Sequence, residues 1–196
     1  MGDLPLVSVT QEPAPGFGHN ICVGRHHPCY GNEFRQIQIG LRAVKTDYVI
    51  TAEADCLYPP EYFKFQPTSG DCYRYGNVWL NYVRPQENSS PKAQVAFFKK
   101  YSDSSQIVRK DFWLDFISKM IGNEERWFDE KDKPKKTPTP ETKTEFTWTS
   151  ESPVITFKTL KNVSRFSSII STKEIKPLTD LPYWGNISKL KKEMAI

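Results

Sequence analysis

The spacing of apolar residues predicts two amphipathic helices. In residues 32–46, apolar side chains recur at every third or fourth position, and this spacing places them on one face of an α-helix. Asn32 is expected to cap the first turn of this helix, because asparagine side chains accept hydrogen bonds from free backbone N–H groups. A second helix is expected from about Lys110 to Ile121, since Gly122 follows it as a stop signal.

Short runs rich in β-branched and aromatic residues predict the strands. Residues 6–10 and 48–51 are two such runs on either side of the first predicted helix. We expect them to be parallel neighbours in a β-α-β unit. Further strands are expected in residues 72–83, 94–98 and 153–157. The order of elements therefore predicts an α/β fold: a mixed, mostly parallel, Rossmann-like sheet flanked by helices.

Two segments depart from this pattern. Residues 129–145 are rich in Lys, Pro, Thr and Glu, and such a segment buries too little apolar surface to order itself. We expect it to be a mobile loop within a single domain that spans residues 1–196. Residues 181–196 begin with Leu-Pro-Tyr-Trp-Gly, which is typical of a compact aromatic turn, and continue as a basic C-terminal helix.

Composition limits the class of protein. The 196 residues carry a formal net charge of +4, which suits ligands that bear phosphate without requiring nucleic acid. No segment has the roughly 18 consecutive apolar residues of a transmembrane helix, and the N-terminus lacks the pattern of a signal peptide. We expect a cytoplasmic protein without a transmembrane segment.

Two carboxylates follow the strand predicted at residues 48–51. Glu53 and Asp55 come directly after it, and Pro59 and Pro60 then direct the chain out of the strand. In open parallel sheets, ligands bind beyond the carboxyl ends of the strands. Acidic residues at such a position can hold a divalent cation that bridges phosphates. The sequence therefore predicts that Glu53 and Asp55 can hold a divalent cation.

The order of these motifs resembles a known family. A strand, a glycine-rich loop and a helix with Asn32, Arg35 and Gln36 precede the acidic motif Glu53-Ala54-Asp55, which is followed by Tyr-Pro-Pro-Glu-Tyr-Phe at 58–63. This order is similar to that of nucleotide-sugar glycosyltransferases of the GT-A fold, close to the family-2-like group, and residues 181–185 look like that family's closing Leu-Pro-Tyr-Trp-Gly.

The resemblance implies a function and a set of site residues. It implies a GT-A-like fold and the transfer of a sugar from a nucleoside-diphosphate donor to a hydroxyl acceptor, such as a glycan, a lipid-linked group, a protein or a modified nucleic acid. It also implies that Asp55, then Glu53, would contact the Mn²⁺ or Mg²⁺ that neutralises the leaving nucleotide. The expected substrate-binding residues are Arg25, Asn32, Arg35, Gln36 and Trp184, and the candidate general base is Asp111.

Each of these roles has a structural alternative. Arg35 can equally brace its own helix, and Trp184 can anchor the C-terminal segment to the core. Few residues precede the strand at 6–10, and Thr159 stands where the family pattern has histidine. These two departures favour a second hypothesis, a non-catalytic carbohydrate- or protein-binding module on a reduced GT-A scaffold. A third hypothesis is a zinc-assisted nucleic-acid binder that uses Cys22, His26, His27 and Cys29.

Overall fold

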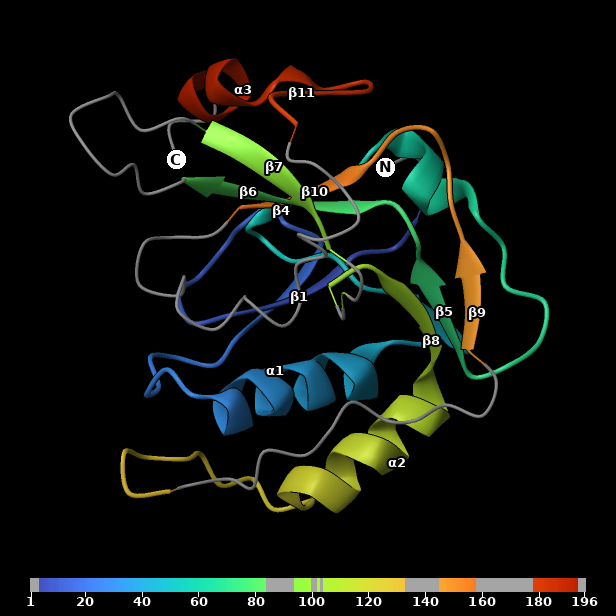
Figure 1. Cartoon of the computed structure of the whole chain (residues 1–196). Helices are drawn as coiled ribbons and strands as arrows, with labels where there is room; N and C mark the ends of the chain where they lie inside the picture. The colour runs from blue at the N-terminus through green and yellow to red at the C-terminus, as the bar shows by residue number, and fades with distance from the viewer. Residues whose placement is uncertain are drawn as a thin grey trace. The chain divides into compact units, whose positions relative to one another are not determined.

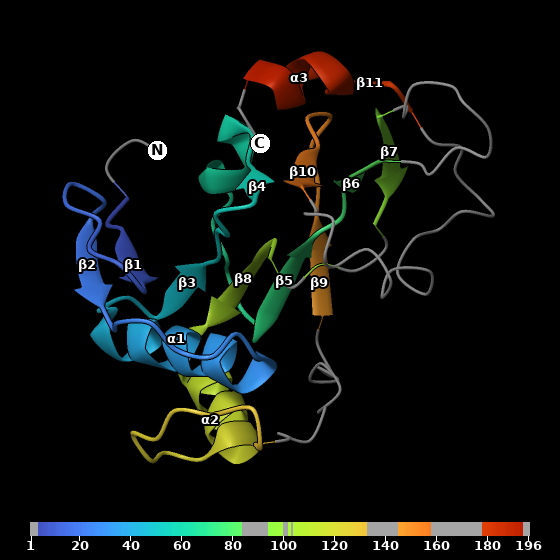
Figure 2. The same ribbon diagram turned by 90° about the vertical axis from the view of Figure 1, so that its left-hand side faces the viewer.

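The computed structural model describes residues 4–83, 94–99, 102, 104–132, 145–157 and 178–193. Contacts within the chain define two compact units. The first unit consists of Met1–Val49 and Val108–Thr144, and the second consists of Ile50–Ile107 and Glu145–Ile196. Figures 1 and 2 show the helices and strands of both units.

The first unit begins with a pair of parallel strands. β1 (Val7–Thr10) pairs with β2 (His19–Cys22) in a two-stranded sheet. Polar side chains join these strands: the Asn20 side-chain amide donates to Ser8 Oγ and to Thr10 Oγ1, each at 2.9 Å. Because these bonds need Asn20 on β2 opposite two hydroxyls on β1, they specify this register.

Two helices complete the first unit. α1 (Tyr30–Ala43) and α2 (Lys110–Ile121) contact each other, and α1 also contacts β1. Gly40 allows the close approach of α1 to β1, because a Cβ atom at this position would lie 3.2 Å from Val9 Cγ2. α2 ends at Gly122, whose φ of 76° suits a helix C-terminus. The core side chains buried on the two helices are Phe34, Leu41, Trp113 and Ile117.

The second unit contains a four-stranded mixed sheet. β4 (Cys56–Leu57), β10 (Val154–Phe157), β6 (Val78–Val83) and β7 (Gln94–Phe98) lie in this spatial order. β10 is antiparallel to β4 and parallel to β6, whereas β6 and β7 are antiparallel. Buried side chains of this sheet form a core with those of the C-terminal segment; they are Trp79, Ala96, Ile155, Phe157, Leu181 and Ile187.

A second four-stranded sheet has the order β3 (Tyr48–Ile50), β8 (Gln106–Arg109), β5 (Cys72–Tyr75) and β9 (Glu145–Trp148). The boundary between the two units falls within β3 and β8. In the second unit, the 3-10 helix η1 (Pro60–Lys64) inserts Tyr62 among aromatic rings of β5 and β9. Tyr62 is fully buried there. Most aromatic residues in this region therefore serve the core.

The second unit ends in a short hairpin and a helix. β11 (Asp180–Leu181) and β12 (Gly185–Asn186) are antiparallel and precede α3 (Ile187–Glu193). Figure 2 shows this segment in red, with α3 beside β11. The aromatic turn expected at 181–185 therefore forms the tip of a hairpin, and the expected basic helix follows it.

The predicted fold class is wrong. Apart from the parallel pair β1–β2, the strands form small mixed or antiparallel sheets. The described part of the chain has three short α-helices, and no mostly parallel Rossmann-like sheet flanked by helices is present there. β1 also pairs with β2 and not with β3. The loop between β1 and β2 explains this error, since Gly18 lies so close to Leu6 that a Cβ would be 2.4 Å from the Leu6 carbonyl oxygen. Only glycine permits this tight return.

Several single elements are confirmed. The predicted helices at 32–46 and 110–121 correspond to α1 and α2, and the strands at 94–98 and 153–157 correspond to β7 and β10. The predicted N-cap is wrong, because Cys29 precedes the first turn and Asn32 lies buried within it. Of the loop predicted at 129–145, residues 133–144 lie outside the described residues, as does Thr159.

Candidate functional site

The acidic motif forms a turn between β3 and β4 in the second unit. Glu53 is exposed, and Asp55 and Cys56 are half-buried. One carboxylate oxygen from each acidic residue and the Cys56 sulfur lie within 4.8 Å of one another. Among the described residues, no other group of three His, Cys, Asp or Glu side chains meets this condition.

Backbone hydrogen bonds hold this turn from both sides. The Cys56 N–H donates to the Glu53 carbonyl at 3.2 Å, which closes the turn. The Phe157 N–H, at the end of β10, donates to the Asp55 carbonyl at 2.7 Å. Because the bonds engage the main chain, they position the turn without needing its carboxylate oxygens.

Tyr58 provides a third support. Its hydroxyl accepts a hydrogen bond from the Glu53 N–H at 2.8 Å and donates one to the Ser104 carbonyl at 2.7 Å. Burial raises the pKa of Tyr58 well above its ordinary value, so the hydroxyl keeps its proton and can donate. Tyr58 therefore bridges the acidic turn and the segment that leads into β8.

The Cys56 thiol lies between the turn and the interior. Its sulfur is 3.5 Å from Asp55 Oδ1, 3.5 Å from Thr156 Oγ1 and 3.7 Å from Ser104 Oγ. Burial is the main cause that raises the pKa of this thiol to about 11; the nearby carboxylates also raise the pKa, and the hydroxyl contacts oppose the increase. The thiol is therefore neutral at neutral pH.

This set of donors fits a hard divalent cation. Two carboxylates supply the oxygen ligands that Mg²⁺ and Mn²⁺ prefer. A neutral thiol is a poor metal ligand, because the thiolate is the coordinating form. Glu53 and Asp55 could therefore hold Mn²⁺ or Mg²⁺, with Cys56 as a neighbour that supports the turn.

Three of the predicted substrate-binding residues are part of an internal network in the first unit. The Asn32 amide donates to the His27 carbonyl at 2.7 Å and to the Phe128 carbonyl at 2.9 Å, and it accepts from the Phe128 N–H at 2.8 Å. Gln36 makes one long contact, 3.5 Å, with the Asn32 carbonyl. Asn32 therefore holds the loop that follows α2 against the start of α1.

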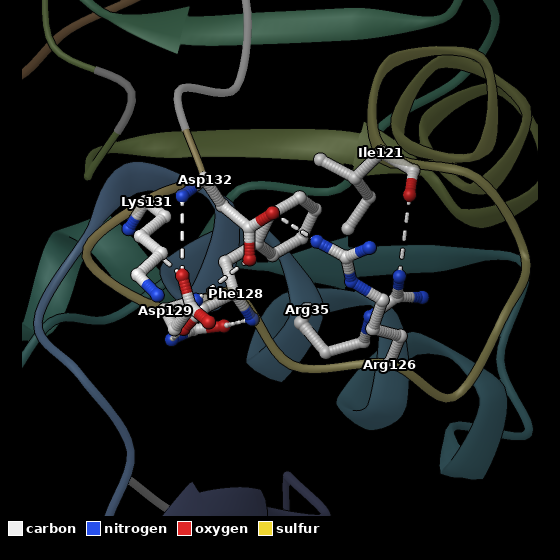
Figure 3. A network of polar contacts seen from close by, with 8 residues as sticks. Arg35, Ile121, Arg126, Phe128, Asp129, Lys131 and Asp132 are labelled. Carbon is white, nitrogen blue, oxygen red and sulfur yellow. Dashed lines mark hydrogen bonds and ion pairs between the residues drawn. The ribbon is translucent and has the colours of Figure 1, made fainter.

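Arg35 holds the end of α2, as Figure 3 shows. Its guanidinium donates to the Ile121 carbonyl at 3.2 Å and to the Gly122 carbonyl at 3.3 Å, and it also bonds Gln38. A positive charge is favourable at a helix C-terminus, where carbonyl groups lack helical partners. The Arg35 pKa is lowered, chiefly by burial and then by Arg42. Apart from the bond to Gln38, these contacts brace the end of α2 and not Arg35's own helix, α1.

Hydrogen bonds and an ion pair also form within the loop after α2. In Figure 3, the Lys131 N–H donates to Asp129 Oδ1, at 2.8 Å, and Arg126 pairs with Asp132. The Asp129 N–H in turn donates to Asp132 Oδ2 at 2.8 Å. A hydrogen bond from Asp129 and the Arg126 partner lower the pKa of Asp132. Residues 129–132, expected to be mobile, thus form a compact bonded turn.

The other predicted site residues are placed as follows. Arg25 is exposed and pairs with Glu12, with Nε 3.1 Å from the carboxylate. Asp111 is exposed in the first turn of α2, and its role as a general base stays a prediction. The Trp184 indole donates to the Pro153 carbonyl at 2.6 Å and packs against the core. Trp184 thus anchors the C-terminal hairpin.

The four proposed zinc ligands do not form a metal-sized group. The His26 ring stacks on Trp127, with ring centroids 3.5 Å apart, and its Nε2 lies 2.8 Å from the Val23 carbonyl. Cys22 is an exposed residue at the end of β2, and Cys29 precedes α1.

Sequence reasoning did not assign Tyr58, Cys56, Ser104 or Thr156 to the site. Tyr58 and Cys56 stood within the motif, but their partners are far along the chain: Ser104 is 46 residues from Tyr58, and Thr156 is 100 residues from Cys56. The polar run around Ser104 carries no periodic signal that would connect it to the acidic turn.

No protein-family model, curated protein or solved structure matches this chain. Within the described ranges, no helix has the length and apolar character needed to cross a membrane.

Proposed function

We propose that this chain is a glycosyltransferase that moves a sugar from a nucleoside-diphosphate donor to a hydroxyl-bearing acceptor, with Mn²⁺ or Mg²⁺ held by Glu53 and Asp55. The observation that carries the proposal is the acidic turn, where ligand atoms of Glu53, Asp55 and Cys56 lie within 4.8 Å of one another. The resemblance of the motif order to nucleotide-sugar glycosyltransferases supports it. A cytoplasmic location is part of the proposal.

The turn suits a reaction in which a diphosphate leaves. A bound divalent cation would neutralise the charge that develops on the leaving nucleotide. The chain's own contribution is to position the backbone that bears the two carboxylates, because the Phe157 and Tyr58 bonds hold it on either side of Ala54. Groups that are positioned before the substrate arrives need little reorganisation during the reaction.

Calorimetric titration with UDP- and GDP-sugars, with and without Mn²⁺, tests this function. We expect nucleotide binding that depends on Mn²⁺ in the unchanged protein. Asp55→Asn should weaken it by more than ~100-fold, because it removes a charged ligand, and loss of a supporting residue alone typically costs 10- to 100-fold. Glu125→Gln is the matched control, since Glu125 is an exposed carboxylate in the first unit.

Two outcomes would count against the proposal. One is the absence of metal-dependent binding to any of these nucleotides. The other is equal binding by Asp55→Asn and Glu125→Gln, which would place any metal elsewhere. Carbohydrate binding without sugar transfer would instead favour a non-catalytic carbohydrate-binding module.

A further inference from the structure

The backbone at Tyr183 adopts an unfavourable conformation. Its φ is 68°, and no other non-glycine residue in the described part of the chain has a positive φ. The Trp184 N–H donates to the Pro182 carbonyl at 2.8 Å. This bond between residues two apart closes a three-residue γ-turn with Tyr183 at its centre. The form of this turn with positive φ is rare and strained, particularly for a bulky residue.

The strained turn exposes an aromatic ring. Tyr183 is 60% exposed, the highest value among the large hydrophobic residues described as exposed. Glycine would adopt the same φ without strain, and a polar residue would avoid the exposed apolar ring. The chain therefore keeps two unfavourable features at one residue, a pattern that points to a functional role.

The surrounding hairpin holds this ring in a defined orientation. The rings of Tyr183 and Trp184 meet edge to face, with centroids 4.7 Å apart and planes at 88°. Trp184 is fixed by its bond to the Pro153 carbonyl, and Leu181 is buried on the other side of the turn. Because its neighbours are anchored, the Tyr183 ring is presented with little freedom to lose on binding.

We propose that Tyr183 is a stacking surface for a pyranose ring, and that the acceptor of the proposed glycosyltransferase is therefore a glycan. The C–H groups on one face of a pyranose carry a slight positive charge, which suits the negative face of an aromatic ring. The sugar hydroxyls need polar neighbours. The hairpin supplies these in exposed Asp180 and Asn186, whose side chains lie 3.4 Å apart.

In the second unit, the Tyr183 turn and the acidic turn both form hydrogen bonds with the backbone at the ends of strand β10. The Pro153 carbonyl, just before β10, accepts the bond from Trp184, whereas the Phe157 N–H, at the end of β10, donates to the Asp55 carbonyl. Both turns are therefore anchored to the same strand, and four residue steps of a strand span about 13 Å. The inference rests on the proposed function for the identity of the ligand as an acceptor.

Saturation-transfer NMR with maltotriose, N,N′,N″-triacetylchitotriose and methyl β-D-galactopyranoside tests the stacking site. We expect transfer to the ring C–H protons of at least one trisaccharide. Tyr183→Phe should keep its affinity within about twofold, and Tyr183→Gly and Tyr183→Ala should lose tenfold or more, because they remove the ring. Phe17→Ala is the control, since Phe17 is a 52% exposed aromatic residue of the first unit.

Thermal unfolding of the same variants separates this role from a structural one. Tyr183→Gly and Tyr183→Ala both lose the ring contact with Trp184, but only glycine relieves the strained φ. Tyr183→Gly should therefore melt about 2–4 °C above Tyr183→Ala. Tyr183→Ala keeps the strain and loses the contact with Trp184, so it should not raise the melting temperature. A melting temperature of Tyr183→Gly far below that of the unchanged protein would show that the ring serves the fold.

The inference is overturned if the unchanged protein binds none of the three sugars, or if Tyr183→Gly binds them as well as the unchanged protein does. It is also overturned if Phe17→Ala causes the same loss of binding. Titration of the same samples with Mn²⁺ and UDP or GDP distinguishes the two proposals. Sugar binding that depends on Tyr183, without metal-dependent nucleotide binding, would reject the glycosyltransferase and leave the stacking site in place.

Discussion

Polar residues that look similar in the sequence have opposite roles in the two units. In the first unit, Asn32 and Arg35 are 2% and 3% exposed, and their side chains bond the backbone of the loop after α2. In the second unit, Glu53 is exposed and Asp55 half-buried, and the bonds that hold their turn engage its main chain. The difference teaches that the Asn32 and Arg35 side chains hold the fold themselves, whereas the acidic turn is held by bonds to its main chain.

The largest expected effect concerns Asn32. Asn32→Ala should lower the free energy of unfolding by about 2 kcal/mol, because three part-buried backbone groups lose a hydrogen-bond partner that water replaces only in part. These groups are the His27 carbonyl and both polar groups of Phe128. Denaturant unfolding measures the change. Gln36→Ala is the control and should cost less than about 0.5 kcal/mol, since Gln36 makes a single long bond.

Denaturant unfolding of a variant in the acidic turn should show almost no loss of stability. Asp55→Asn should leave the free energy of unfolding within about 0.5 kcal/mol of the unchanged protein, because it reduces repulsion between two nearby carboxylates. A loss as large as that of Asn32→Ala would remove the distinction between the two regions.

The next effect concerns the thiol at the edge of the acidic turn. A pKa of about 11, against an ordinary 9.0, means that Cys56 has about 100-fold less thiolate below pH 9, and the thiolate is the reactive form. Iodoacetamide labelling at pH 8, followed by mass spectrometry, should therefore modify exposed Cys22 long before Cys56. Labelling of Cys56 should accelerate as the pH rises toward 11. Equal rates in the folded protein would show that the turn is open to solvent around the thiol.

The smallest expected effect concerns Tyr58. Tyr58→Phe removes the hydroxyl that joins the Glu53 N–H to the Ser104 carbonyl. We expect about tenfold weaker Mn²⁺ affinity, as is typical when a group that orients a metal ligand is lost. Tyr75→Phe is the control, because it removes a buried hydroxyl that bonds Ser152 in the same unit. It should cost similar stability, about 1 kcal/mol, and leave Mn²⁺ affinity unchanged. Equal affinities of the two variants would show that Tyr58 does not position the metal ligands.

Local elements of this chain could be predicted from the sequence, and their arrangement could not. The helix at 110–121 was predicted correctly because apolar periodicity and Gly122 are local signals. The pairing of β10 with both β4 and β6 joins residues about 75 to 100 positions apart, and no local pattern encodes such contacts. The short strands β2, β4, β8 and β9 were missed, because β2, β8 and β9 contain His, Gln, Arg or Glu and β4 has only two residues, so none stands out as a β-branched run.

Some residues of the candidate site could be chosen from the sequence, whereas the roles of others could not be predicted. Glu53 and Asp55 could be chosen because two carboxylates follow a buried strand before a pair of prolines. The roles of Asn32 and Arg35 could not be read in the same way, because a buried amide and a substrate-binding amide have the same residue type. Only the contacts with the loop after α2, which is more than 80 residues away, distinguish the two roles.

Metal binding at the acidic turn can be observed directly in crystals grown with Mn²⁺ and UDP or GDP, with diffraction measured at the manganese absorption edge. The account predicts an anomalous peak in direct coordination with an Asp55 carboxylate oxygen, at about 2.0–2.2 Å, with Glu53 beside it and the nucleotide diphosphate bound to the same ion. An anomalous peak elsewhere in the protein, or nucleotide bound without metal at this turn, would contradict it.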